Sequence, residues 1–211
     1  MTAAGVARRA QEPAAVDQTT EKILDAALAQ FLDFGLRRTT VEDIAVRAGV
    51  SRVTVHRRFG RKDDLIQGVI MRELALFLRE LDAALAPLET LEEKLVEGFV
   101  VTMRAARTDP LIARVLKTEP EALLPELTVR GGPFLAAATA YLVAAARTEA
   151  PGVLEDDVAA VGEIFIRLIA SFTLTPSSTA RLDDDRAARA YARRYLTPLL
   201  ATIRKKPRSK R

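Results

Sequence analysis

The residues that could carry chemistry are concentrated in one basic segment of this sequence. Residues 37–62 contain eight Arg or Lys and two acids, Glu42 and Asp43, so the segment has a net charge of +6. The single His of the chain, His56, lies within it. Guanidinium and ammonium groups bind phosphate oxygens, and an Arg side chain can donate two hydrogen bonds to one guanine. The segment therefore points to binding of a polyanion.

A second basic cluster lies at the C-terminus, where residues 204–211 hold six Arg or Lys and no acid. The whole chain carries +4 and these two segments carry +6 each, so the remainder carries −8. A basic patch on an otherwise acidic molecule favours a localised polyanion site, although charge by itself fits a solvated helix face equally well. We expect residues 204–211 to form a disordered, solubilising tail, with a DNA-contacting arm as the alternative.

Catalytic and membrane functions have little support in the residue pattern. The chain has no Cys, so it has no thiolate nucleophile, disulfide or Cys-ligated metal site. The acidic clusters at residues 156–157 and 183–185 fall at predicted helix starts, where carboxylates complement the helix dipole. No apolar run reaches the roughly 18 residues of a membrane span, and residues 1–17 lack the apolar segment of a secretory signal. We expect a cytoplasmic protein that is not an enzyme, with no cofactor, metal site or membrane partner.

Helical periodicity dominates the chain, and strand signals are nearly absent. We therefore predict an all-α fold of about nine helices, with short irregular pieces between residues 110 and 132. The expected helices cover residues 20–35, 40–48, 51–59, 64–85, 91–108, 133–150, 155–174 and 184–203. The expected domains are a disordered arm (1–18), a small helical domain (19–66), a larger helical domain (67–203) and the basic tail (204–211).

Two short helices joined by a tight turn are predicted at residues 40–59. Thr40-x-x-Asp43 has the form of a capping box, and Ser51 can cap the second helix. Gly49 between them can supply the turn. Apolar residues on the inner faces can anchor both helices, namely Ile44, Ala45, Val50, Val55 and Phe59. This pattern is a helix-turn-helix, in which the second helix enters the major groove of DNA.

The segment TTVEDIAVRAGVSRVTVHRRFGRKDDL resembles the DNA-binding domain of TetR-family (tetracycline-repressor-like) regulators. The matching positions are Thr39-Thr40, Ile44-Ala45, Ala48-Gly49-Val50-Ser51, Thr54-Val55-His56, Arg58-Phe59 and Lys62-Asp63-Asp64-Leu65. The sequence departs from the usual pattern at His56, where the family commonly has Tyr, and at Arg58, where it often has His or Tyr. Both replacements retain hydrogen-bond donors and add positive charge.

The resemblance implies a set of DNA-binding residues. Phosphate contacts would come from Thr40, His56, Arg58 and Lys62. Base-edge contacts would come from Arg52, Val53, Thr54 and Arg57. Thr39 and Ser51 complete the set of predicted DNA-binding residues.

The larger domain is expected to have two roles, dimerisation and ligand binding. The helix at 155–174 is apolar on more than one face and so needs a further partner, although a monomer could also bury such a face internally. The predicted dimer interface consists of Val161, Phe165, Leu168, Phe172, Tyr195, Leu199 and Ile203. Candidate ligand-lining residues are Phe99, Met103, Arg104, Phe134, Tyr141, Phe165 and Arg167, with core packing or surface exposure as the alternative for each.

The resemblance implies a homodimeric transcriptional regulator that binds a double-stranded DNA operator. We expect a repressor that a small-molecule effector of mainly hydrophobic character releases from the operator. By linkage, DNA must then weaken effector binding by the same factor. The alternative is a regulator of the same fold that does not respond to a ligand, or an activator.

Overall fold

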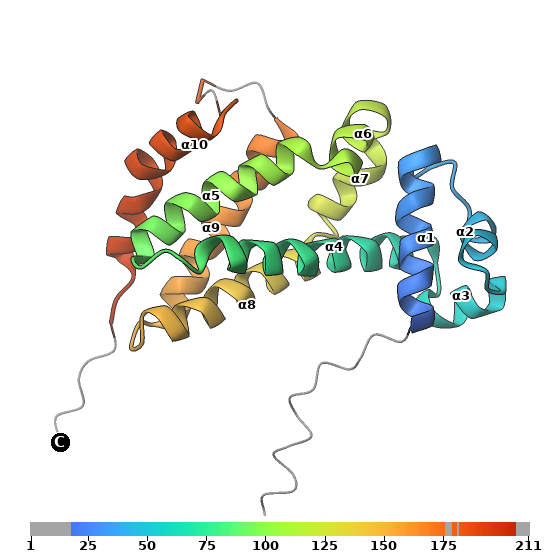
Figure 1. Cartoon of the computed structure of the whole chain (residues 1–211), viewed down its shortest axis with the longest axis horizontal. Coiled ribbons are helices and arrows are strands. Elements are labelled where there is room, and N and C mark those ends of the chain that lie inside the picture. The colour runs from blue at the N-terminus through green and yellow to red at the C-terminus, as the bar shows by residue number, and fades with distance from the viewer. Residues whose placement is uncertain (1–17, 176–178, 181, 206–211) are drawn as a thin grey trace, which may run out of the picture. The chain divides into compact units, whose positions relative to one another are not determined.

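The computed structural model describes residues 18–175, 179, 180 and 182–205, and only the backbone at positions 122, 123, 126 and 127. Over these residues the fold is all-α, as the sequence predicts (Figure 1). The helices are α1 (Gln18–Phe34), α2 (Val41–Ala48), α3 (Arg52–Phe59), α4 (Lys62–Leu85), α5 (Leu91–Thr108), α6 (Pro110–Thr118), α7 (Pro120–Leu127), α8 (Gly132–Glu149), α9 (Glu155–Leu174) and α10 (Asp185–Tyr191), which continues as a π-helical turn (Ala192–Leu196) and a 3-10 helix (Thr197–Thr202). None of the helices in this described part is long and apolar enough to cross a bilayer.

The chain divides into two compact units. The smaller unit runs to Phe34 and resumes at residues 38–69, and the larger unit consists of residues 35–37 and everything from Ile70 onward. The first eight residues of α4 therefore belong to the smaller unit and the remainder to the larger.

The core of the smaller unit is formed by one apolar side of each helix. Ile23, Ala27 and Phe31 of α1 are fully buried, and their spacing of four residues places them on one helix face. The other helices add buried apolar side chains, which include Ile44 and Ala45 of α2, Val55 of α3, and Leu65 and Val69 of α4. The predicted inner face of the helix-turn-helix is therefore confirmed for Ile44, Ala45 and Val55, whereas Val50 and Phe59 are half-buried.

An aromatic cluster lies at the centre of the larger unit. Phe99 of α5 is fully buried, stacks against Tyr191 at 5.9 Å between ring centroids and meets Phe165 edge-on at 5.6 Å. Phe172 in turn meets Tyr191 edge-on at 5.5 Å. Aromatic pairs in these arrangements add to the stabilisation from burial, so α5, α9 and α10 are held together at one point.

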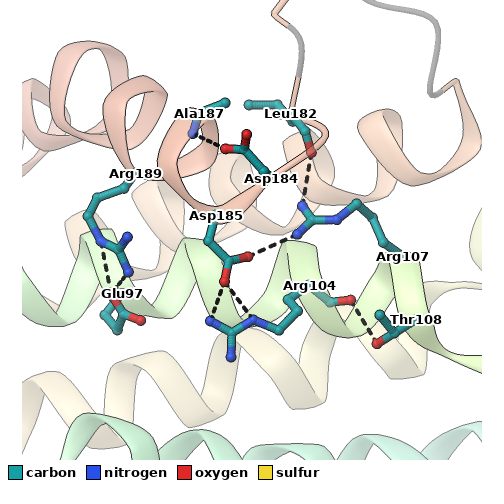
Figure 2. A network of polar contacts seen from close by, with 9 residues as sticks. All are labelled: Glu97, Arg104, Arg107, Thr108, Leu182, Asp184, Asp185, Ala187 and Arg189. Carbon is teal, nitrogen blue, oxygen red and sulfur yellow. Dashed lines mark hydrogen bonds and ion pairs between the residues drawn. The ribbon is translucent and has the colours of Figure 1, made fainter.

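A network of charged side chains fastens α10 to α5 beside this cluster (Figure 2). Asp185 accepts hydrogen bonds from Arg104 at 2.6 and 2.9 Å and from Arg107 at 3.0 Å. One helical turn further on, Arg189 donates to Glu97 at 2.6 Å. The hydrogen bonds from Arg104, and to a smaller extent the one from Arg107, hold the pKa of Asp185 below its usual value.

The segment between residues 110 and 127, expected to be irregular, is helical instead. Pro110 and Pro120 stand at the first positions of α6 and α7, where the missing N–H has no partner to lose and the fixed φ already suits a helix. The side chain of Asp109 also caps α6 by accepting from the N–H of Ile112 at 2.7 Å. These prolines therefore begin helices, whereas the sequence interpretation took them as breaks.

The last predicted helix, 184–203, also differs from expectation because its second half is not α-helical. Pro198 lies near the start of the 3-10 helix, directly after the π-helical turn. A proline inside an α-helix lacks its N–H donor and clashes with the carbonyl four residues earlier. The change from α to π to 3-10 geometry fits that conflict.

The beginning of the expected basic tail is an ordered part of the larger unit. Arg204 donates to the carboxylate of Asp157 at 2.7 and 2.8 Å, and the N–H of Leu154 donates to the Arg204 carbonyl at 2.9 Å. Lys205 forms an isolated bridge with Val153. The pKa of Asp157 falls to about 2, chiefly because it accepts hydrogen bonds from Arg204. The prediction of disorder was therefore wrong for Arg204 and Lys205, and residues 206–211 lie outside the described residues.

Candidate DNA-binding surface

Local hydrogen bonds fix both ends of α2. The hydroxyl of Thr40 accepts from the N–H of Asp43 at 3.2 Å, and the Asp43 carboxylate accepts from the N–H of Thr40 at 2.9 Å and from its hydroxyl at 2.6 Å. These bonds, with a smaller effect from Lys62, hold the pKa of Asp43 below its usual value. Gly49 ends the helix at φ +67°, in the left-handed region that suits glycine. The predicted capping box and turn are both confirmed.

The inner side of α3 fixes how this helix sits on the smaller unit. Ser51 caps the helix by accepting from the N–H of Thr54 at 3.1 Å, and Val55 is 1% exposed. Phe59 packs over Gly68 of α4, where an added Cβ would come within 2.9 Å of the Phe59 ring. The glycine therefore lets α3 approach α4 closely, which no side chain at that position would allow without a shift.

The outer side of α3 is basic and exposed. Arg52, His56, Arg57 and Arg58 are all exposed, and Val53 is 75% exposed. Most of the Val53 side chain is outside the core of the unit. An exposed apolar side chain among cations suits contact with a nucleic acid, whose grooves offer both phosphates and thymine methyl groups.

Two of these cations lie near polar side chains of the neighbouring helices α1 and α2. Arg58 donates to the hydroxyl of Thr20 on α1 at 2.8 Å, and Nε of Arg52 lies 3.9 Å from the Glu42 carboxylate on α2. Arg57, in contrast, makes no ion pair with any residue in the described ranges.

The remaining predicted DNA-binding residues occupy different environments. Thr39 is 2% exposed and donates its hydroxyl to the carbonyl of Gln30 at 3.2 Å, so its side chain faces the interior and not the surface. Thr54 is half-buried, with its hydroxyl 2.9 Å from that of Ser51. Lys62 is half-buried at the first position of α4. The sequence placed Thr39 in the site because it belongs to the motif, and only the fold shows that its side chain is internal.

The residues predicted to line an effector site lie in several different environments. Phe99 and Met103 are buried in the core cluster, with Phe165 packed against it. Arg104 pairs with Asp185, and Arg167 pairs with Glu163 one turn before it. Tyr141 donates to Asp82 at 2.6 Å, and Phe134 is half-buried. An effector-binding role for these residues stays a prediction.

The residues predicted for dimerisation are mostly packed within the subunit. Phe165, Leu168, Phe172 and Leu199 lie against the core cluster around Phe99. Ile203 lies against a second cluster, and Val161 is half-buried.

Several apolar side chains of the larger unit are exposed instead, among them Val129 at 88%. Tyr195 is 53% exposed and lies beneath the guanidinium of Arg194, while Ile164 of α9 is 51% exposed. Sequence reasoning did not place Ile164 in the interface. Its outward direction on α9 is visible only once Phe165 and Leu168 are known to face inward.

The smaller unit thus has the architecture of a helix-turn-helix DNA-binding protein. A family model described as bacterial regulatory proteins, tetR family, matches residues 23–69. A second model, the C-terminal domain of the bacterial tetracyclin repressor, matches residues 91–193. The chain therefore belongs to the TetR family of bacterial regulatory proteins.

Individual relatives agree with this placement. An uncharacterized HTH-type transcriptional regulator of Mycobacterium bovis is 36% identical over 102 residues, which cover 48% of this chain and 51% of that protein. The chain therefore spans about half the length of that relative. The HTH-type transcriptional regulator AlkX of Mycobacterium tuberculosis is 26% identical over 74% of this chain and 75% of its own length.

A solved structure extends the similarity over most of the fold. The TetR family repressor AlkX from Dietzia sp. strain DQ12-45-1b, implicated in biodegradation of n-alkanes, superposes with a TM-score of 0.71 at 25% identity. The alignment covers 87% of this chain and 98% of that one.

Proposed function

We propose that this regulator is a homodimeric repressor that binds a two-fold operator with α3 in the major groove and leaves it when a small molecule binds the larger unit. The observation that carries the proposal is the exposed outer side of α3, where Arg57 has no acidic partner among the described residues. An unpaired, solvated cation is poised to replace counterions on DNA phosphates or to bind a guanine edge. The repressor role is favoured by the likeness to the Dietzia repressor.

Dimerisation is supported by exposed apolar side chains on α9 and on the π-helical turn that follows α10. Ile164 and Tyr195 expose about half of their surface in the single chain. A second copy that covers them would remove that apolar area from water, which is favourable at roughly 25 cal/mol for each Å². A two-fold dimer also presents two α3 helices to two half-sites.

The effector is expected to be mainly apolar. Support comes from the AlkX repressor of Dietzia, which is implicated in n-alkane biodegradation, and from the apolar character of helices α8 and α9. A regulator that does not respond to a ligand, or an activator, is the alternative. The proposal assigns the protein no catalytic activity and places it with the chromosome in the bacterial cytoplasm.

Selection of bound sequences from random duplex DNA tests the proposal directly. The purified full chain should enrich an inverted repeat, and light scattering should give the mass of a dimer at micromolar concentration. Failure to enrich any sequence would overturn the operator-binding function. Enrichment of a single unrepeated site by a monomer would overturn the dimer.

A further inference from the structure

The eight residues of α3 form four pairs spaced by four residues, and each pair faces one direction. About 3.6 residues make one helical turn, so residues i and i+4 lie on the same side. Val55 and Phe59 make the inward side, being buried and half-buried. The other three pairs are 52 with 56, 53 with 57, and 54 with 58.

Two of these pairs lie on the flanks of the helix, and each flank is held by a neighbouring element. Arg52 lies near Glu42 of α2, at 3.9 Å. On the other flank, Thr54 contacts the Ser51 hydroxyl at 2.9 Å and Arg58 donates to Thr20 of α1 at 2.8 Å. When α3 lies in the major groove of DNA, side chains that turn toward α1 and α2 face the phosphate backbone at the sides of the groove and not the base edges at its floor.

The remaining pair, Val53 and Arg57, lies opposite the buried side. In steps of about 100° per residue, Arg57 points directly away from the mean direction of Val55 and Phe59, and Val53 lies about 40° from Arg57. Val53 is 75% exposed, and Arg57 is exposed with no ion pair to a residue that the structure describes. When α3 enters a groove, this pair meets the base edges first.

We propose that Val53 and Arg57 are the two base-reading residues and that they require a thymine and a guanine in each half-site. This assignment rests on the proposed DNA-binding function and narrows it. Arg57 recognises guanine through O6 and N7, and Val53 contacts the thymine 5-methyl group, the one apolar group on the major-groove floor. Four residues of helix rise about 6 Å, so the two bases lie about two base-pair steps apart at 3.4 Å per step. The flanking pairs contact phosphates.

The guanine assignment is tested by selection from random duplex DNA with Arg57→Ala and, as a matched control, Arg58→Ala. Both variants remove one exposed Arg from neighbouring positions of the same helix. Arg57→Ala should lose the preference for one guanine in each half-site, a preference of about 5- to 150-fold in the unaltered chain. Arg58→Ala should keep the same motif with weaker binding overall. Retention of every guanine by Arg57→Ala, or its loss in Arg58→Ala, would overturn the assignment.

The thymine assignment is tested on the selected operator with deoxyuridine in place of each thymine, which removes only the methyl group. At one position in each half-site the unaltered chain should lose about fourfold in affinity, the value expected for one buried methyl. Val53→Ala should lose nothing further from that replacement. If no uracil weakens binding, or if Val53→Ala is equally sensitive, Val53 does not read thymine. If the unaltered chain enriches no sequence at all, the proposed function fails and this assignment fails with it.

Discussion

Helix α3 of the smaller unit and the α5–α10 junction of the larger unit use arginine in opposite ways. In the larger unit Arg104, Arg107 and Arg189 are each paired with a carboxylate, and together they fasten α10 to α5 (Figure 2). In the smaller unit the arginines of α3 have a distant acid, a hydroxyl or, for Arg57, no acidic partner in the described chain. Paired arginines stabilise a fold, whereas an unpaired arginine on a rigid helix is available for a ligand.

The exposed apolar side chains of the two units also have different surroundings. Exposed side chains of the larger unit include Ile164 and Tyr195, which are suited to contact with the apolar surface of another protein. On α3 the exposed apolar residue is Val53, which is surrounded by cations. The comparison therefore supports the proposed self-association through the larger unit and the proposed DNA binding through the smaller one.

The largest effect is expected from Ile164→Asp. A carboxylate in an apolar interface loses its hydration without gaining a partner, so the dimer should dissociate at micromolar concentration. Operator affinity should then fall by about 100-fold or more, because one half-site supplies only part of the contacts. Sedimentation or light scattering measures the mass, and a binding titration measures the affinity. Val129→Asp is the matched control, since Val129 is 88% exposed in the same unit. Equal behaviour of the two variants would contradict the assigned interface.

A smaller effect is expected from Asp185→Asn, which removes the acceptor shared by Arg104 and Arg107. Because all three side chains are partly exposed, the loss should be about 1 kcal/mol in the free energy of unfolding, or about 3 °C in Tm. Operator affinity below the melting transition should stay within threefold. A large loss of DNA binding without a loss of stability would contradict the claim that the arginines bound to Asp185 serve the fold and not DNA binding.

The same variant gives a prediction for pH. The pKa of Asp185 in the folded chain is lowered from 3.8, mainly by Arg104. A lowered folded-state pKa contributes stability above the unfolded value, and that contribution disappears as the pH falls through the folded value. The difference in unfolding free energy between the unaltered chain and Asp185→Asn should therefore be constant above about pH 5 and shrink below pH 4. A difference that persists at pH 2 would show that the ionised carboxylate is not its source.

The smallest effect is expected from Lys62→Ala at the start of α4. If Lys62 contacts one phosphate, its loss should weaken binding about three- to fivefold on every sequence and lower the salt slope by about one. Titrations against the operator and an unrelated duplex, at several salt concentrations, measure both quantities. An unchanged slope would remove Lys62 from the DNA-binding surface.

The elements that could be predicted from the sequence are those fixed by local interactions. The capping box joins Thr40 to a residue three positions away, and the turn depends on Gly49 by itself. Helix phase follows from apolar spacing, which is why the inner residues Ile44 and Val55 were placed correctly. The general position of α3 and its exposed cations follow from the same periodicity.

Features that depend on distant segments could not be predicted. Arg104 meets Asp185 across 81 residues, and Arg204 meets Asp157 across 47 residues. The burial of Thr39 depends on its bond to Gln30 in the preceding helix. Sequence patterns carry no information on such pairings, so Arg104 was considered for a ligand and Arg204 for a disordered tail.

The central claim, that the outer face of α3 binds DNA, is tested most directly by one titration of two matched variants. Val53 on α3 and Val46 on α2 are each 75% exposed, so Val53→Asp and Val46→Asp introduce the same charge at equal exposure. The new carboxylate at position 53 lies in the first turn of α3, where it favours the helix dipole and does not unfold the helix. We predict that Val53→Asp loses at least about 100-fold in operator affinity through repulsion of phosphates and loss of a base contact, while Val46→Asp changes it less than threefold. Equal losses in the two variants, or full affinity in Val53→Asp, would contradict the account.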